Sequence, residues 1–271
     1  MPELPEVEIT KQGMMPLLGQ QVRHVVTRTF ALRWPIPAHL GQTLADQKLQ
    51  KLTRRAKYIL AEFETGVLIF HLGMSGRISL LPDEMPAEKH DHFDVVFYNN
   101  QLLRLHDPRR FGAVLWSENP LKHPLLINLG VEPLDDCFDA GYLHQKLHHK
   151  KAAIKTIIMD SHLVVGVGNI YASESLFRAR ISPQMHARDL SLQQCDQLVK
   201  AIKATLIDAL KAGGSSLRDF FGADGSPGYF QQEYFVYGRT RQPCKICEAV
   251  ITHIRQGQRS TFYCPNCQPS N

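Results

Sequence analysis

The spacing of apolar residues changes about half-way along the chain and predicts two kinds of structure. Up to about residue 130, apolar and β-branched residues occur in short runs beside glycines, as in GVLIFHLGMSGRISLL, which is typical of β-strands. The stretch HFDVVFYNNQLLRLHD holds two such runs and predicts a hairpin that turns at Asn99 and Asn100. Ahead of the strands we expect one helix, interrupted near Gly13 and Pro16, with a stripe formed by Val7, Lys11, Met14 and Leu18.

Helical spacing dominates after GVEPLDD, a stretch that reads as a linker. The clearest helix is predicted to start at Ser191, where Gln194 completes a capping box, and to end at Gly213 and Gly214. Its buried stripe should consist of Cys195, Leu198, Val199, Ile202, Leu206, Ala209 and Leu210. Residues 217–235 are rich in glycine and aromatic residues without periodicity, which indicates a functional loop.

Composition bounds the class of protein. At 271 residues and 44% hydrophobic content, the chain is long enough for two domains with packed cores, and a wholly disordered protein is excluded. No run approaches the ~18 apolar residues of a membrane span, and no secretory signal is visible, so a soluble, cytoplasmic protein is expected. The net charge of +5 and the pI near 8.9 favour a polyanionic partner only weakly, because many metabolic enzymes are as basic.

Basic residues concentrate in two stretches. Residues 237–271 contain five basic residues and one acidic residue. The stretch LHQKLHHKKAAIK adds Lys146, Lys150, Lys151 and Lys155 without an acidic residue. Each stretch alone is most simply a solvated face, but two of them in one chain favour nucleic acid as the partner.

Four of the six cysteines form two CxxC pairs: Cys244, Cys247, Cys264 and Cys267. This spacing predicts one structural Zn²⁺ held by four thiolates, which leaves no open coordination position for catalysis. A disulfide framework and a redox pair are the alternatives, and both fit an intracellular chain less well. Cys137 and Cys195 are expected to be buried, inert thiols.

Two further segments have the residues that anion binding needs. Between the CxxC pairs, HIRQGQRSTFY predicts a hairpin that presents Arg255 and Arg259 to phosphate, or that merely adds solubility. In LVVGVGNIYASESLF, Gly166 and Gly168 precede a helix with Asn169 at its N-cap position. The segment does not match the dinucleotide-binding pattern, and a phosphate grip between two helices is the better interpretation.

The first residues, MPELPEVE, offer a candidate nucleophile. Removal of Met1 would leave Pro2 as a terminal secondary amine, whose pKa near ~8 keeps a useful fraction unprotonated at neutral pH. Such an amine can attack the C1′ carbon of a sugar, and its imine is a permanently charged iminium. Glu3 could act as the acid or base, and the two prolines would stiffen the terminus. Proline at position 2 is nevertheless ordinary, so this chemistry is not forced.

Eight motifs in order resemble the formamidopyrimidine-DNA glycosylases: MPELPEVE, RRAKY, HLGMSG, KHDH, DPRRFG, VVGVGNIYASE, VYGR and the closing CxxC…CPxCQ. The match runs from the first residue almost to the last. Leu4 favours the branch acting on formamidopyrimidines and 8-oxoguanine over the endonuclease VIII branch, which usually begins PEGPE.

The resemblance implies an α+β multidomain protein. It would consist of a β-sandwich catalytic domain with a flanking helix (1–130), a helix–two-turn–helix DNA-binding domain (131–225), and the end of the lesion loop with a four-cysteine zinc finger (226–271). It implies a bifunctional DNA glycosylase/AP lyase of base excision repair in a bacterial cytoplasm, associated with the nucleoid through DNA. The partner would be double-stranded DNA with oxidised bases or abasic sites, with no membrane, no organic cofactor and one Zn²⁺ per chain, and the enzyme would act as a monomer.

The resemblance also implies residue roles. Pro2 would attack C1′ with Glu3 supplying proton chemistry, Lys57 would donate a proton in β-elimination, and Arg259 would hold phosphates and assist δ-elimination. The DNA contacts would be His90, Met74, Arg109, Phe111, Lys150 and Asn169, of which Met74, Arg109 and Phe111 fill the gap left by the flipped nucleotide.

Each role has a simpler counterpart. Lys57 would otherwise be a surface lysine, the histidines of KHDH strand-end residues, and Met74 and Phe111 core residues. The rival functions are an enzyme of the same fold for oxidised pyrimidines and a non-catalytic, damage-binding zinc protein.

Overall fold

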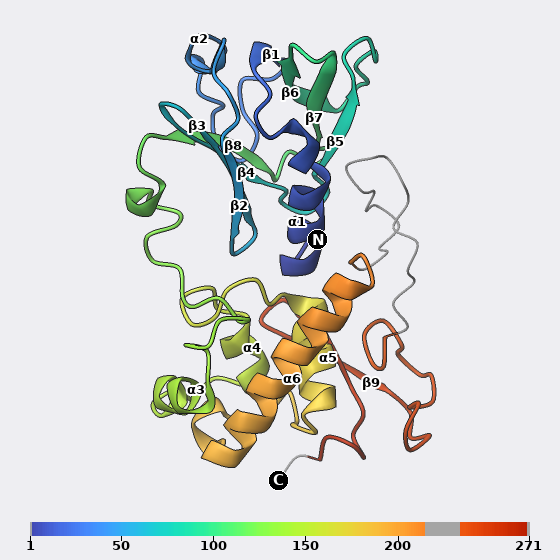
Figure 1. Ribbon diagram of the computed structural model, residues 1–271. Helices are drawn as coiled ribbons and strands as arrows, with labels where there is room; N and C mark the ends of the chain where they lie inside the picture. Colours follow the sequence, from blue (N-terminus) through green and yellow to red (C-terminus); the bar gives the residue numbers. More distant parts are fainter. Residues whose placement is uncertain (1, 215–233, 270–271) are drawn as a thin grey trace. The chain divides into compact units, whose positions relative to one another are not determined.

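The computed structural model describes residues 2–214 and 234–269 and divides into two compact units (Figure 1). One unit comprises the described parts of residues 1–127 and 212–231, and the other those of residues 128–211 and 232–271. The predicted change from strands to helices is confirmed, because the first unit holds two sheets and the second holds α3 to α6. No described helix has the length and apolar character needed to cross a bilayer.

The first unit is a sandwich of two four-stranded antiparallel sheets. One sheet has the order β1 (Val22–Thr27), β6 (Asp91–Phe97), β7 (Gln101–His106), β5 (Arg77–Pro82). The other has the order β2 (Lys51–Arg55), β3 (Tyr58–Phe63), β4 (Gly66–His71), β8 (Ala113–Ser117). The hairpin expected at Asn99 and Asn100 joins β6 to β7, and Asn100 takes the positive φ of 61° that the turn needs.

Side chains of both sheets share one core. Phe70 from β4 and Phe93 from β6 meet edge to face with ring centroids 6.1 Å apart, and both rings are almost fully buried. The short helix α2 (Leu40–Leu44) adds Leu40 and Leu44 to the same cluster. The sandwich therefore forms a rigid base for the loops at its edges.

The predicted early helix is confirmed as α1 (Leu4–Gly13), followed by the 3₁₀ turn η1 (Met15–Leu17) after the expected interruption. Helix α1 packs against β2, β3 and β5. An ion pair between Arg54 Nε of β2 and Glu8 Oε2 of α1, 3.2 Å apart, joins the helix to the sheet, and both side chains are largely shielded from solvent.

The second unit contains α3 (Ala140–Leu147), α4 (Ile154–Ile158), α5 (Asn169–Arg178), the 3₁₀ turn η3 (Ala187–Asp189) and α6 (Leu192–Lys211). The capping box of α6 is present as predicted, since Ser191 N donates to Gln194 Oε1 (2.9 Å) and Gln194 N to Ser191 Oγ (3.2 Å). The predicted stripe of α6 is buried apart from Leu210, which is half-buried. A short 3₁₀ turn, η2 (Pro120–Lys122), lies on the chain before this unit.

The chain between the CxxC pairs forms the predicted hairpin, β9 (Thr252–Gln256) and β10 (Arg259–Tyr263). Two expectations about single residues are wrong. Cys137 is exposed because its neighbour Phe138 takes the buried position ahead of α3. Asn169 is not the N-cap of α5 but its first helical residue, because Gly168 takes the extended N-cap conformation. The loop expected at residues 217–235 lies almost entirely outside the described residues.

A buried ion-pair network holds β6 against β7 within the sandwich. Asp94 lies directly opposite Arg104, which donates from Nε to Oδ1 (3.0 Å) and from Nη2 to Oδ2 (2.9 Å). Arg28 Nη2 donates to the same Oδ2 at 2.6 Å. Burial alone would raise the pKa of Asp94, but the hydrogen bonds and charges of Arg104 and Arg28 outweigh it and lower the pKa below 3.8.

Replacing Asp94 by Asn should therefore destabilise the sandwich. The variant leaves the buried Arg104 cation without its bidentate partner, which typically costs ~3 kcal/mol of the free energy of unfolding at neutral pH. Because the folded pKa of Asp94 is depressed, its contribution is complete above pH 3.8 and is lost as the pH falls further. Urea unfolding at neutral and acidic pH should show a large difference between wild type and Asp94→Asn that shrinks in acid. Asp83→Asn, at the more exposed pair with Arg23, is the control and should cost less than ~1 kcal/mol.

Candidate active site and metal centre

The N-terminus of α1 holds the backbone beside Pro2 in one conformation. Glu3 is the N-cap residue and is almost fully buried, and its amide donates to Glu6 Oε2 at 2.8 Å. The carboxylate of Glu3 accepts in return from the Glu6 amide, which completes a capping box. Sequence reasoning missed this structural role of Glu6, although its spacing from Glu3 is the signal of such a box.

Lys57 lies in the turn between β2 and β3 and is half-buried. Ala56 takes a positive φ of 55° in this turn, and Arg54 Nη1 donates to its carbonyl at 2.8 Å. Arg54 also pairs with Glu8, so one guanidinium ties the turn that carries Lys57 to the helix that begins after Glu3.

His71 gives this part of the first unit an uncharged imidazole. Burial lowers the pKa of His71 to about 4, and the positive charges of Lys57 and Arg33 act in the same direction. Its ring lies 4.8 Å from that of Tyr58, the residue after Lys57. At neutral pH the histidine therefore adds no positive charge beside the Lys57 ammonium. Sequence reasoning did not identify His71, because only the fold buries it.

The predicted gap-filling residues lie at loop tips, and they are not core residues. Met74 is 41% exposed and Phe111 is 46% exposed, which is unusual for side chains of their size and polarity. Arg109 places its guanidinium 4.9 Å from the centre of the Phe111 ring. The structure thus brings Arg109 and Phe111 together on one surface loop that follows β7.

His90 is half-buried in the loop before β6 and packs edge to face against His92 and His106. Its neighbours are satisfied by the protein: His92 Nε2 lies 3.0 Å from the Asp107 carbonyl oxygen, and His106 Nδ1 lies 2.8 Å from Asp91 Oδ1. Within residues 2–214 and 234–269, only the four cysteines are grouped closely enough to hold a metal ion, so KHDH is no metal site there.

In the second unit, a buried lysine joins two of the predicted residues. Lys155 of α4 is 2% exposed, and its Nζ donates to Asn169 Oδ1 (2.6 Å), Ser260 O (3.0 Å) and Thr261 Oγ1 (2.7 Å). Ser260 directly follows Arg259, so Lys155 fixes the side chain of Asn169 relative to the backbone next to Arg259. A small cavity of about 200 Å³ lies beside this junction and is lined by Lys155, Asp160 and Arg259, among others. Lys155 belongs to the basic stretch that favoured nucleic acid as the partner, but it is buried and bonded to oxygens of the protein itself.

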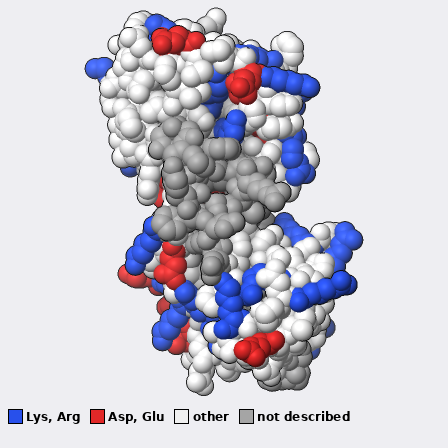
Figure 2. All heavy atoms as spheres, turned by 90° about the vertical axis from the view of Figure 1, so that its right-hand side faces the viewer, with Lys and Arg blue, Asp and Glu red and all other residues white. Residues whose placement is uncertain are grey.

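The second unit also carries exposed cations. Lys150, which follows α3, and Arg259 are both exposed. Figure 2 shows several lysine and arginine side chains on one face of the second unit. Such a surface is suited to an extended polyanion.

Glu174 anchors the segment that leads into the zinc finger. Its carboxylate accepts from the amides of Phe235 (2.9 Å), Val236 (2.9 Å) and Tyr237 (2.8 Å). Burial raises the pKa of Glu174 although these three hydrogen bonds oppose the shift. No local pattern in the chain indicates this anchor, because it joins residues about sixty positions apart.

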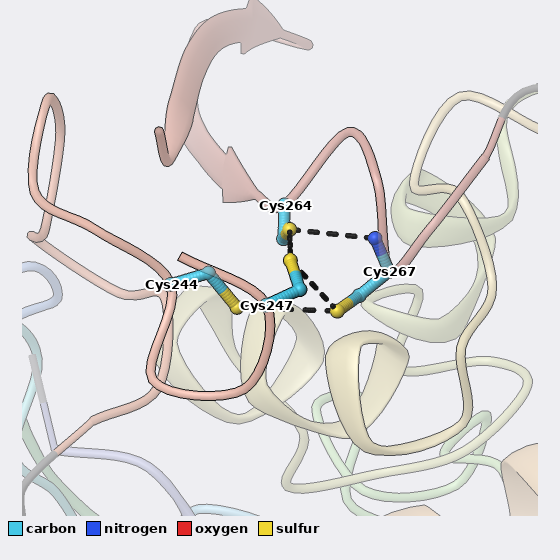
Figure 3. Close-up of side chains that lie close together, drawn as sticks. All are labelled: Cys244, Cys247, Cys264 and Cys267. Carbon is cyan, nitrogen blue, oxygen red and sulfur yellow. Dashed lines mark hydrogen bonds between the residues drawn. The ribbon is translucent and has the colours of Figure 1, made fainter. Parts of the chain in front are cut away.

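The four predicted cysteines converge on one point, as Figure 3 shows. Their sulfurs all lie within 4.8 Å of one another, and individual pairs are 3.4 and 3.9 Å apart. These separations are too long for disulfides but match the ~3.8 Å edge of a tetrahedron with Zn–S bonds of ~2.3 Å. The cluster is therefore positioned to bind one Zn²⁺ that holds the hairpin carrying Arg259.

Three family descriptions match successive parts of the chain. They are the formamidopyrimidine-DNA glycosylase N-terminal domain (residues 1–114), the formamidopyrimidine-DNA glycosylase H2TH domain (129–221) and a zinc finger found in FPG and IleRS (241–269). A formamidopyrimidine-DNA glycosylase of Methylobacillus flagellatus is 61% identical over 276 residues, which cover 100% of this chain and 99% of the relative. The chain belongs to the formamidopyrimidine-DNA glycosylase family.

Other relatives agree. The formamidopyrimidine-DNA glycosylase of Escherichia coli O6:H1 is 51% identical over 99% of this chain and 100% of its own. The crystal structure of MutM (Fpg) from Thermus thermophilus has a TM-score of 0.88 at 35% identity and covers 100% of both chains. MutM in complex with DNA containing carbocyclic 8-oxo-G, and Lactococcus lactis Fpg in complex with abasic-site DNA, each have a TM-score of 0.90 at 33% identity over 99% of this chain and 100% of their own. The family resemblance, the enzyme class and the zinc finger are thus confirmed for this formamidopyrimidine-DNA glycosylase family member.

Loss of the metal should disable the DNA-binding hairpin of the glycosylase. A four-thiolate zinc site supplies on the order of 10 kcal/mol to the folding of such a small unit, so Cys244→Ser should lower DNA affinity at least ~100-fold. Metal content by atomic absorption and duplex binding by fluorescence anisotropy check this outcome. Cys137→Ser, at the exposed thiol outside the cluster, should keep both zinc and binding. Normal binding by a metal-free Cys244→Ser protein would show that the hairpin does not depend on the cluster.

Proposed function

We propose that this protein is a bifunctional DNA glycosylase/AP lyase that excises oxidised purines, chiefly 8-oxoguanine and formamidopyrimidines, and that Pro2 is its nucleophile. The proposal rests on one observation in this family member: a capping box closes the N-terminus of α1, directly after Pro2. The buried Glu3–Glu6 box fixes the backbone next to Pro2, so a terminal amine would be presented without the disorder usual at chain ends.

The first step is displacement of the base. The lone pair of the Pro2 nitrogen forms a bond to C1′, and the electron pair of the glycosidic bond leaves with the base, which needs a proton. Glu3 lies next to Pro2 in the chain and is buried, and its carboxyl group handles the protons of this step. Opening of the sugar then gives an iminium at Pro2.

The second step is strand cleavage. The iminium withdraws electrons, so water takes the C2′ proton and the C2′–H electron pair forms the C2′=C3′ double bond. The 3′ phosphate leaves with the C3′–O bonding pair and takes up a proton at its oxygen. Lys57 supplies the proton that this β-elimination requires, and its turn is tied to α1 through Arg54. The neighbouring His71 is neutral, so it adds no second positive charge beside the Lys57 ammonium that donates the proton. In a further δ-elimination, water takes the C4′ proton and the 5′ phosphate leaves with the C5′–O bonding pair, while Arg259 binds the phosphate oxygens.

The second unit supplies the grip on the DNA backbone. Asn169 and Arg259 are held by Lys155, and Lys150 adds an exposed charge. The relatives bound to abasic-site DNA and to 8-oxo-G DNA support double-stranded DNA with such lesions as the partner. Met74, Arg109 and Phe111 are proposed to fill the gap after the lesion leaves the stack, which their exposure supports. His90 is proposed as a DNA contact from the neighbouring loop.

The cellular setting follows from the same partner. The relatives are bacterial, and we place the enzyme in the cytoplasm, at the nucleoid, through its DNA binding. The domain limits 1–130, 131–225 and 226–271 are proposed as its functional divisions, and a monomer is proposed as the active form.

Borohydride trapping on an 8-oxoguanine·cytosine duplex tests the nucleophile. Untagged protein should form a covalent complex, and mass mapping should place the crosslink on Pro2, because reduction freezes the iminium. A variant with a peptide fused ahead of Pro2 should form no complex, since an amide nitrogen has no available lone pair. A crosslink at Lys57 would reverse the two roles, and a duplex with an oxidised pyrimidine as the better substrate would move the enzyme to the rival lesion class.

Lys150→Ala should weaken DNA binding without changing lesion preference. Removing one phosphate contact should make the slope of log K against log salt shallower by ~0.9. Binding to intact and lesion-containing duplexes over a salt series measures both quantities. Lys200→Ala is the control, because that exposed lysine already pairs with Asp196 at 2.7 Å. A changed ratio between lesions in Lys150→Ala would contradict a phosphate role.

A further inference from the structure

Asp107 is a buried carboxylate at the meeting point of three loops of the first unit. It directly follows β7, and its exposed fraction is 0%. The loop that starts there carries Arg109 and Phe111, a second carries Met74, and a third carries His90. An unpaired carboxylate at such a position would be costly, so its hydrogen bonds define what it does.

The carboxylate itself joins two of the loops. Ser75 Oγ donates to Asp107 Oδ1 at 2.8 Å, and Gly112 N donates to Oδ2 at 2.7 Å. The amide of Arg109 donates in turn to Ser75 Oγ at 3.3 Å. Ser75 and Gly112 are the immediate neighbours of Met74 and Phe111, so one side chain sets the backbone next to both.

The backbone of Asp107 joins the third loop. Its amide donates to the carbonyl of His90 at 2.9 Å. Its carbonyl oxygen lies 3.0 Å from His92 Nε2, and since a carbonyl only accepts, Nε2 carries the proton. His90 is therefore fixed through a main-chain bond to the same residue that holds the other two loops.

Close backbone contact makes this junction rigid. A Cβ on Gly73 would collide with the backbone carbonyl of Phe111, and Gly73 also takes a positive φ of 61°. A Cβ on Gly112 would lie 2.9 Å from Asp107 Oδ2 and 2.8 Å from the His71 carbonyl oxygen. The two loops thus touch through their main chains, with no side chain between them.

We propose that Asp107 is the positioning residue that sets Met74, Arg109 and Phe111 as one preformed wedge, and that it thereby controls how the enzyme reads the base opposite the lesion. This inference rests on the proposed gap-filling role of those three residues. A preset wedge avoids the entropic cost of ordering its two loops when the lesion leaves the stack. Asp107 therefore acts on extrusion and on opposite-base selection, while the chemistry at Pro2 is separate.

Two variants loosen the wedge to different degrees. Asp107→Asn keeps the shape but replaces one acceptor oxygen by a donor amide, so the Gly112 amide and Ser75 no longer both find acceptors. Ser75→Ala removes the hydrogen bond from the Met74 loop to Asp107 and the acceptor of the Arg109 amide, but it keeps the buried carboxylate and its bond to the Gly112 amide. Asp83→Asn, at the half-exposed pair with Arg23 in the same unit, is the matched control.

Three measurements separate positioning from mere folding. The ratio of excision rates for 8-oxoguanine opposite cytosine and opposite adenine reports opposite-base selection. The fluorescence of 2-aminopurine placed opposite an abasic site reports wedge insertion without any turnover. Borohydride trapping on single-stranded abasic DNA reports the chemistry of Pro2 where no gap exists to be filled.

We expect the selection ratio to fall ~10-fold in Asp107→Asn, which is the size of effect that the loss of one charge-assisted hydrogen bond produces. In Ser75→Ala the ratio should fall by less. The 2-aminopurine signal should fall in the same order, while single-stranded trapping stays at the wild-type rate. In a double-mutant cycle, Ser75→Ala should add little to Phe111→Ala, because both act on one wedge.

Two results would overturn the positioning role: an unchanged selection ratio in both variants, or full additivity of Ser75→Ala with Phe111→Ala. If Asp107→Asn does not fold, the Ser75→Ala results alone decide between these outcomes. A failure of the proposed function itself is distinguishable, because it shows in the wild-type enzyme: no trapped complex forms, or the crosslink maps to Lys57, or an oxidised pyrimidine is the better substrate.

Discussion

The constraint on which the proposed chemistry depends is that a reactive group at a chain terminus must be held still. Termini usually fray, because few contacts oppose their conformational entropy. Here the capping box between Glu3 and Glu6 uses the first turn of α1 to fix the backbone beside Pro2. The Arg54–Glu8 pair then connects that helix to the turn of Lys57. The acidic residues Glu3, Glu6 and Glu8 of the opening sequence thus hold the start of α1 next to the proposed nucleophile, in a protein that is basic overall.

In the second unit, a buried ammonium group takes the supporting role that the carboxylates have at α1. Arg259 lies on a two-stranded hairpin, which is marginal alone. The cysteine cluster holds the open end of the hairpin, where the chain enters β9 and leaves β10. Beside Arg259, Lys155 binds the backbone of Ser260 and the side chain of Thr261. Since the same ammonium binds Asn169, the two phosphate-binding candidates share one support. In both units, therefore, a buried charged group holds the backbone beside a candidate functional residue: Glu3 lies beside the half-buried Pro2, and Lys155 binds the residue after the exposed Arg259.

The sequence predicts those features of the fold that depend on local signals. The capping box at Ser191, the hairpin at Asn100 and the two CxxC pairs each depend on residues close together in the chain, and each is confirmed. The supports of the site were missed, because they join distant positions. Lys155 and Thr261 are 106 residues apart, so no periodicity or spacing could pair them. Composition also misled at Cys137, where the buried place went to the neighbouring Phe138.

The surroundings of Lys155 have a consequence for chemical reactivity. An ammonium has three N–H donors, and all three have an oxygen partner here, in a side chain that is 2% exposed. Acylating reagents need the free amine in contact with solvent, so they would modify Lys150 and Lys151 and pass over Lys155. The lysines of one short basic stretch therefore belong to two populations, which amine labelling followed by peptide mapping would distinguish. Lys150 and Lys151 are open to solvent and to polyanions, and Lys155 is committed to the protein's own oxygens.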